Sequence, residues 1–345
     1  MKRVGIISLL CVIMTFCLSA CKEKKESKQE VQLSQLDMET TLNDINEKIK
    51  KDPENGVLYQ QKGELLLKNG YISEALLSLI SAVDLDSTNV QGWSALYDIY
   101  ALLENYIEAE NALIQAIKLD KDNEDVLLKL SKHYLIFQNY EDVRFNLDHV
   151  LNINPYNAQA IYLYGIYSIE LGDTAKAIDY YNRALEIDHN LYDAHMSLAL
   201  IYDIRNNPVA ADYYENAIAL RPNFLPGLYN LAYYYQENLG RYDDALAVYD
   251  EILSKDPNYY NALFNKGYIY LVYKEDPNMA VEYFRTAAEV VYPKNPDVIY
   301  NIGFCLELMG NRREARSIYN NIMTEFPDYN LAIEGLKRVG RFDWQ

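Results

Sequence analysis

Cysteine is scarce in this sequence, and its placement excludes a disulfide-stabilised fold. The 345 residues include four cysteines. Cys11, Cys17 and Cys21 lie in or directly after an N-terminal apolar run, which leaves Cys305 alone in the rest of the chain. No internal pair remains to form a disulfide, so the fold must be held together by packing. Cys305 falls within an amphipathic segment, where we expect a buried small hydrophobe rather than a reactive thiol.

Positive charge is also in short supply. The chain has 32 lysines and arginines against 50 aspartates and glutamates, which gives a formal net charge of -18. Nucleic acid and anionic lipid head groups would be repelled by a body this acidic. The sequence therefore predicts no nucleic-acid partner, and any attachment to a membrane must come from something other than the charge of the body.

The usual signs of catalysis or metal binding are missing. The four histidines are scattered, with no cysteine or carboxylate at metal-ligand spacing: His133, His149, His189 and His195. We expect them to be solvated or packed. No strand is predicted, and no glycine-rich phosphate loop is found. We therefore predict no catalytic residue, no metal and no cofactor.

A single long apolar run lies at the N-terminus. Lys2 and Arg3 precede it, and its 17 residues, Val4 to Ala20, are fewer than the roughly 20 that a spanning helix needs. Residues 1–20 therefore predict a secretory signal peptide. The ending Leu-Ser-Ala-Cys resembles a bacterial lipobox, and this resemblance implies cleavage before Cys21 and a lipid on its sulfur. An uncleaved N-terminal anchor is the alternative, and either would tether the body to a membrane.

Two short segments separate this run from the rest of the chain. Residues 21–35 are charged and polar without aromatics, and they predict a flexible tether. Residues 36–55 predict an N-terminal capping helix, because Leu42, Ile45 and Ile49 share one stripe and Pro53 follows them.

The stretch from Pro296 to Tyr329 sets a pattern that most of the chain repeats. Apolar or small residues recur at i, i+4 and i+7 on either side of an interruption at Gly310-Asn311. This spacing predicts two amphipathic helices joined by a tight turn, with Pro327 ending the second. Neither helix has a second apolar face of its own, so the unit needs copies of itself on both sides.

Those copies are present along the chain. Units start at Gly56, Val90, Glu124, Ala158, Tyr192, Leu225, Tyr260 and Pro296, with spacings of 34, 34, 34, 34, 33, 35 and 36 residues. The pattern resembles the tetratricopeptide repeat (TPR), a helical hairpin of 34 residues. The family has a small residue in its eighth place, here Gly63, Ser131, Gly165, Ala199, Ala232, Gly267 and Gly303, with Tyr97 the one departure. The family's twentieth place is alanine in every unit but one, where Val143 stands.

The resemblance implies an all-α fold. We expect a right-handed α-solenoid of about eight TPR hairpins over residues 56–329. Residues 330–345 are then a C-terminal cap helix and tail, because Leu331, Ile333, Leu336 and Val339 share one side.

The chain holds 33 tyrosines, and most of the repeated ones are explained by packing. Twelve stand in the eleventh, seventeenth and twenty-fourth places, which the family uses for packing. Others stand in the fifth and ninth places, which line the inner face of TPR proteins. In repeats six to eight the fifth, sixth and ninth places read aromatic, asparagine, aromatic: Tyr229, Asn230, Tyr233; Phe264, Asn265, Tyr268; Tyr300, Asn301, Phe304.

We predict that these nine residues bind a peptide segment or a helix of a partner protein. Aromatic rings offer rigid apolar contact area, and an asparagine amide both donates to and accepts from an extended backbone. The plain alternative is that asparagine in the sixth place supports the neighbouring turn and that tyrosine is a common surface residue here. A clamp for acidic peptides is not supported, because Lys129 and Lys132 are isolated and Lys266 falls on a packing place.

The favoured function is a non-enzymatic scaffold for protein-protein interaction. The signal and the lipobox place it in the bacterial envelope as a lipid-anchored protein, with the outer membrane favoured, where it would recruit another envelope protein. The alternative function is an accessory protein that binds peptidoglycan or another carbohydrate, with the same rings stacking on sugars.

Overall fold

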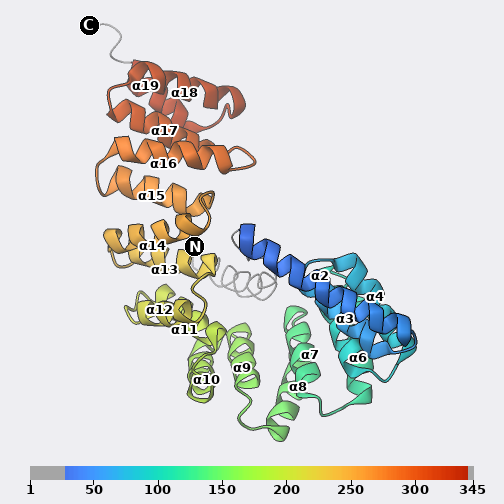
Figure 1. Cartoon of the computed structure of the whole chain (residues 1–345). Coiled ribbons are helices and arrows are strands. Elements are labelled where there is room, and N and C mark those ends of the chain that lie inside the picture. The colour runs from blue at the N-terminus through green and yellow to red at the C-terminus, as the bar shows by residue number, and fades with distance from the viewer. Residues whose placement is uncertain (1–27, 341–345) are drawn as a thin grey trace. The chain divides into compact units, whose positions relative to one another are not determined.

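The computed structural model describes residues 28–340, and all regular structure within them is helical (Figure 1). These residues form 18 helices. The predicted all-α class is therefore confirmed. The predicted signal peptide, residues 1–20, and the predicted lipidation site Cys21 lie outside the described residues, as do residues 341–345.

The helices follow one another as a capping helix, eight hairpins and a second capping helix. α2 (Lys28–Lys51) comes first and packs against α3. The hairpins are α3 (Gly56–Lys68) with α4 (Ile72–Leu85), α5 (Val90–Leu102) with α6 (Tyr106–Leu119), α7 (Glu124–Ile136) with α8 (Tyr140–Ile153), α9 (Ala158–Glu170) with α10 (Thr174–Ile187), α11 (Tyr192–Ile204) with α12 (Ala210–Leu220), α13 (Leu225–Glu237) with α14 (Tyr242–Lys255), α15 (Tyr260–Val272) with α16 (Pro277–Val290), and α17 (Pro296–Leu308) with α18 (Arg312–Glu325). α19 (Asn330–Gly340) closes the series and packs on α18.

The first helix of every hairpin begins at the residue that the repeat pattern predicts. Local capping explains several of these starts. The side chains of Asn89, Asn123 and Asn157 each accept a hydrogen bond from a backbone N–H in the first turn of α5, α7 and α9. Pro296 stands at the first position of α17, where its missing N–H costs nothing. The repeat boundaries are thus set by short-range chemistry.

The boundary of the N-terminal capping helix differs from the predicted one. α2 begins at Lys28, inside the segment that the sequence predicts as a flexible tether. Lysine, glutamine and glutamate from residue 28 onward are strong helix formers, so they extend the amphipathic helix toward the N-terminus. The cap helix at the other end, α19, starts at the predicted Asn330.

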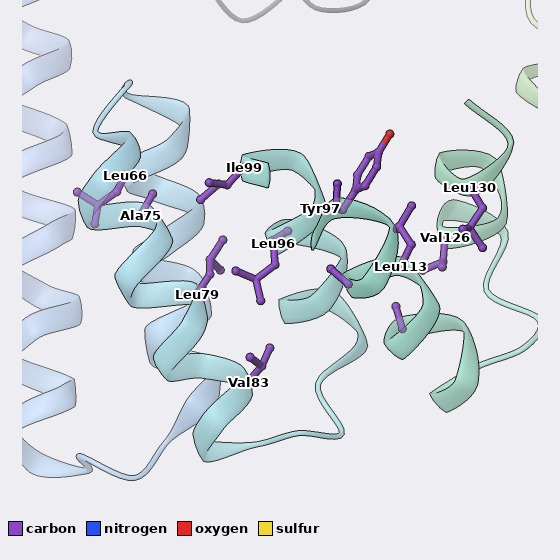
Figure 2. Close-up of a cluster of buried hydrophobic side chains, with 14 of the residues drawn as sticks. Leu66, Ala75, Leu79, Val83, Leu96, Tyr97, Ile99, Leu113, Val126 and Leu130 are labelled. Atoms are coloured by element: carbon purple, nitrogen blue, oxygen red, sulfur yellow. The ribbon is translucent and has the colours of Figure 1, made fainter. Parts of the chain in front are cut away.

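The described residues fall into two compact units, 28–197 and 198–340, with the boundary inside α11. In each unit the hairpins succeed one another in chain order (Figure 1). The core of the first unit is a run of aliphatic side chains from successive helices, including Leu79, Leu96 and Leu113 (Figure 2). Full burial of such a side chain stabilises the fold by about 1.5–3 kcal/mol. Each hairpin therefore depends on its neighbours for its stability.

In several hairpins, a glycine of the first helix packs against a buried ring of the second helix. A methyl group added at Gly165 would lie 2.3 Å from the ring of Tyr181, and one at Gly303 would lie 2.6 Å from the ring of Tyr319. Both rings have no exposed surface. The eighth place must therefore be small wherever the twenty-fourth place holds a ring, which confirms the packing role predicted for these tyrosines. Cys305 is likewise fully buried, and burial raises its pKa to about 12, so it behaves as a small hydrophobe.

The substitution Gly165→Ala tests this close approach. The added methyl group would overlap the Tyr181 ring, which has no free space to move into, so we expect a loss of about 1–3 kcal/mol in the free energy of unfolding. The measurement is urea unfolding of the full chain followed by circular dichroism. Gly340→Ala is the control, since nothing lies within 4 Å of the added methyl group there. Equal midpoints for Gly165→Ala and the natural chain would contradict the packing argument.

His133 is a packing residue of the first unit. Its side chain is 2% exposed, and its ring lies 4.8 Å from the ring centroid of Phe137 and 6.0 Å from that of Tyr97. Burial lowers the pKa of His133, and the carboxylate of Glu110, at 4.0 Å, opposes this only in part. The imidazole is therefore neutral in the folded chain at neutral pH.

This burial predicts a pH dependence of stability. Because the pKa of His133 is lower in the folded chain than in the unfolded one, the unfolded chain takes up the proton first as the pH falls. The stability is fully present above the ordinary histidine pKa of about 6.5 and decreases below it. We expect the unfolding free energy of the natural chain to fall more between pH 7.5 and 5 than that of His133→Leu. Parallel curves from denaturant titrations at each pH would show that His133 is not responsible.

Candidate functional site

The nine residues predicted to bind a partner all lie in the second unit, on α13, α15 and α17. We call them the aromatic face: Tyr229, Asn230, Tyr233, Phe264, Asn265, Tyr268, Tyr300, Asn301 and Phe304. Direct contacts join the first two helices, because the amide of Asn265 donates to the Tyr229 hydroxyl at 3.2 Å. The third is joined through Asn295, just before α17, whose amide donates to the Tyr260 hydroxyl at 3.1 Å. The structure thus brings these residues onto adjoining helices.

The fifth-place rings form the wall of this face rather than its free surface. Tyr229, Phe264 and Tyr300 are half-buried. Each packs on the ring in the twenty-fourth place of its own hairpin, Tyr249, Phe284 and Tyr319, at centroid distances of 6.2, 5.5 and 5.7 Å. These contacts hold the three rings in place, so the part of the aromatic face that they form exists before any partner binds.

The ninth-place rings are more open and differ from one another. Tyr233 is 44% exposed and stacks on Tyr229 with ring centroids 6.0 Å apart. Tyr268 meets Tyr273 edge to face at 6.0 Å. Phe304 is covered by the guanidinium of Arg338 from α19, 5.5 Å from the ring centroid. Repeats six and seven therefore offer the open rings, and the cap helix occupies part of repeat eight.

The three asparagines of the aromatic face are placed differently. Asn265 is buried and uses its amide to hold Tyr229. The Nδ2 atom of Asn230 is buried and has no hydrogen-bond partner among the described residues. A buried donor of this kind costs free energy unless another molecule supplies an acceptor. Asn301 is half-buried. Among the three, Asn230 is the amide with an unused donor.

The hydroxyls of Tyr229 and Tyr233 on this face, and of Tyr273 beside it, stay protonated over the neutral pH range. Burial raises the pKa of Tyr229, and it raises the pKa of Tyr233 together with the nearby charge of Glu237. Burial likewise raises the pKa of Tyr273, again with a contribution from Glu237. The hydroxyls are therefore neutral donors and acceptors, suited to backbone and side-chain polar groups of a ligand.

The same places in the first unit carry charges that are already paired. The Nζ atom of Lys129 lies 2.9 Å from a carboxylate oxygen of Asp98 and 2.8 Å from the hydroxyl of Ser94. Burial raises the pKa of Asp98, and the Lys129 cation opposes this in part. Lys266 in the second unit is buried and bonded to Asp250, with its Nζ 4.6 Å from the ring centroid of Tyr283. These lysines serve internal contacts, which fits the expectation that no clamp for acidic peptides is formed.

Sequence reasoning missed Arg338 and Glu307. Arg338 donates to Glu307 through Nε at 2.8 Å and through Nη2 at 2.9 Å, and it also donates to the Tyr300 hydroxyl at 3.2 Å. In the sequence pattern Arg338 lies on the polar side of the cap helix. A polar side predicts a solvent-exposed side chain, so no contact with the aromatic face was expected. The sequence did contain a signal. Arg338 lies 34 residues after Phe304, so it stands where the ninth residue of a further repeat would be.

The histidines and carboxylates show no metal centre. Within residues 28–340, no group of three or more histidines, cysteines, aspartates or glutamates is placed to hold a metal ion. In that same part of the chain, no helix combines the length and the apolar character that crossing a bilayer requires.

The fold and the aromatic face define a helical-repeat protein. Its preformed surface lies on the first helices of consecutive hairpins. Comparison with protein families names the repeat: three tetratricopeptide repeat models match residues 158–190, 213–247, 260–290 and 297–329. The chain therefore carries tetratricopeptide repeats, as its residue pattern predicted. A comparison with curated proteins finds no match.

Solved structures show the same fold at low identity. A monomeric mutant of IFIT1 with Gppp-AAAA is 16% identical, with a TM-score of 0.60 over 88% of this chain and 76% of that chain. The human IFIT1 dimer with PPP-AAAA is also 16% identical, with a TM-score of 0.56 over 89% of this chain and 79% of that one. A tetratricopeptide repeat protein from Parabacteroides merdae is 18% identical, with a TM-score of 0.47 over 73% of this chain and 99% of that one. At 16% identity the likeness to the two IFIT1 structures concerns the fold alone.

Proposed function

We propose that this chain is a non-enzymatic scaffold that binds a partner protein through the aromatic face of repeats six to eight. One observation carries the proposal: the first helices of three successive hairpins carry rings that are held in place from behind, and repeats six and seven add the more open rings of Tyr233 and Tyr268. Rigid aromatic side chains of this kind lose little conformational entropy on binding and dominate many protein interfaces.

The charge of the chain narrows the kind of partner. A formal net charge of -18 opposes binding to nucleic acid, so the ligands printed with the IFIT1 structures, such as Gppp-AAAA, are not carried over to this chain. A protein segment meets no such barrier. A sugar would also stack on exposed rings, and this is the second candidate, favoured by the open ring of Tyr233 alone.

The triple change Tyr233→Ala, Tyr268→Ala and Phe304→Ala tests the aromatic face. The partner is first identified by crosslinking in intact cells followed by mass spectrometry, and its affinity for the purified chain is then measured. We expect at least a tenfold loss of affinity, because about 1–2 kcal/mol is lost for a truncated hot-spot ring. The matched control is Phe145→Ala with Tyr156→Ala, two rings of the first unit that are 68% and 75% exposed.

Three outcomes decide between the candidates. Unchanged capture by a folded triple variant rejects the aromatic face. Equal losses in the triple variant and the control show that the effect is not local to this face. Sedimentation of the natural chain with cell-wall polysaccharide, lost in the triple variant, replaces the protein partner with a carbohydrate.

We further propose that a lipid on Cys21 anchors the scaffold to the bacterial envelope, with the outer membrane as the favoured location. The support is the N-terminal sequence pattern, since an acidic body does not itself bind an anionic membrane. Single-chain anchoring by lipid is marginal, so the lipid set on a processed cysteine should include more than one acyl chain.

The change Cys21→Ser tests the anchor. We expect the natural chain to take up labelled fatty acid and to fractionate with membranes, and the variant to do neither, because its hydroxyl replaces the sulfur that carries the lipid. Cys305→Ser, which removes the remaining thiol of the body, should leave both labelling and fractionation unchanged. A variant that still fractionates with membranes, without label, would favour the uncleaved N-terminal anchor.

A further inference from the structure

Two tyrosines stand at the same place on adjoining first helices of the second unit. Tyr233 is the ninth residue of α13, and Tyr268 is the ninth residue of α15. Asn265, one turn before Tyr268, donates to the hydroxyl of Tyr229, and the Tyr229 ring stacks on that of Tyr233 with centroids 6.0 Å apart. These contacts and the repeat register place the two rings on neighbouring helices of one face. We call Tyr233 and Tyr268 the open tyrosine pair.

The open tyrosine pair is bounded by the repeats on either side. The ninth residue of α11 is Leu200, which has no ring. The ninth residue of α17 is Phe304, which has no hydroxyl and whose ring is covered by the guanidinium of Arg338. Among the eight repeats, tyrosine therefore occupies the ninth place in repeats six and seven alone.

The hydroxyl groups of the open tyrosine pair are not used within the described residues. Neither hydroxyl makes a hydrogen bond to another of residues 28–340. A tyrosine nearer the core of the same helices differs, because the hydroxyl of Tyr235 donates to Glu215 at 2.6 Å. Tyr233 is exposed and Tyr268 is half-buried. The pair therefore offers a ligand two ring surfaces and two O–H donors.

The spacing of neighbouring helices limits which ligand backbone can contact both rings in the same way. Packed helices lie about 8–10 Å apart. Side chains on one face of a β-strand recur about every 6.8 Å, which does not match this spacing. A polyproline II helix makes one turn in three residues, or about 9.3 Å. An α-helix places residues seven apart at about 10.5 Å, so the spacing alone favours either kind of helix.

Hydrogen bonding distinguishes these two ligand backbones. The carbonyl groups of an α-helix are engaged within the helix, so the two O–H donors would find no acceptor on its backbone. A polyproline II helix has no internal hydrogen bonds and leaves its carbonyl groups free. Proline rings also pack on grooves lined by aromatic side chains, and the fixed φ of proline reduces the entropy lost on binding. The open tyrosine pair therefore matches a polyproline II segment in spacing and in hydrogen bonding.

We propose that the open tyrosine pair binds a proline-rich segment of the partner protein in the polyproline II conformation. Prolines three residues apart pack on the rings of Tyr233 and Tyr268, and the two hydroxyls donate to carbonyl groups of the segment. This inference rests on the proposed function and names the class of partner segment. A segment without charge meets no repulsion from a chain whose formal net charge is -18.

The test is a titration of labelled decaproline, blocked at both ends, with the purified full-length chain, followed by fluorescence anisotropy. A glycine-serine peptide of the same length is the control probe, because it is flexible and has no proline ring. We expect saturable binding of decaproline and none of the control peptide. The affinity should depend little on salt, because the peptide is uncharged.

Two variants separate the rings from the hydroxyls. Tyr233→Phe with Tyr268→Phe keeps both rings and removes both donors, so we expect decaproline to bind about tenfold more weakly. Tyr233→Ala with Tyr268→Ala removes the rings as well and should abolish binding. The matched control is Tyr71→Phe with Tyr156→Phe, two tyrosines of the first unit that are 45% and 75% exposed, and it should bind as the natural chain does.

Two results overturn this inference. One is decaproline that binds the natural chain no better than the glycine-serine peptide does, at concentrations up to about 1 mM. The other is decaproline that binds the double phenylalanine variant as tightly as the natural chain. In either case the proposed function is decided separately, by the partner identified through crosslinking. A partner that is lost in the Tyr233, Tyr268 and Phe304 triple variant leaves the proposed function standing, and a partner that is retained counts against both.

Discussion

The close approach of the two helices in each hairpin is the constraint on which the rest of the structure depends. Gly165 and Gly303 leave room for the buried rings of Tyr181 and Tyr319, and no larger residue fits there. Where the eighth place is a glycine that meets a ring, as in α9, α15 and α17, this contact limits how the first helix can rotate about its own axis. Because the rotation repeats from hairpin to hairpin, the fifth and ninth places of α13, α15 and α17 present the same face. The aromatic face therefore follows from the packing of small residues behind it.

Much of the fold could be predicted from the sequence because its signals are local. Asparagine caps such as Asn89 and the proline at Pro296 act within one helical turn and explain several of the hairpin starts, all of which fall where the pattern indicates. The start of α2 was not predictable in the same way. The residues from Lys28 are polar, and polarity alone does not distinguish a solvated helix from a tether.

The site was predicted less completely because its details depend on contacts between distant residues. The repeat places indicate which rings share a face, but the half-burial of Tyr229 requires the rings of Tyr249 and Tyr259 beside it. Coverage of Phe304 depends on Arg338, 34 residues later in the chain, and the repeat register places the two in line without showing that the guanidinium lies over the ring. The repeat pattern predicts where a side chain lies on its helix. It does not predict which distant residue of the same chain covers that side chain.

The ion pairs of the described residues show where the few cations of so acidic a chain are used. Lys129 and Arg338 are committed to contacts with Asp98 and Glu307 inside their own units. Once such pairs are made, the surplus charge of the chain remains negative, and carboxylates such as Glu237 are left to face solvent. Exposed pairs add little stability, so this surplus costs the fold little. The same scarcity of cations opposes the binding of nucleic acid.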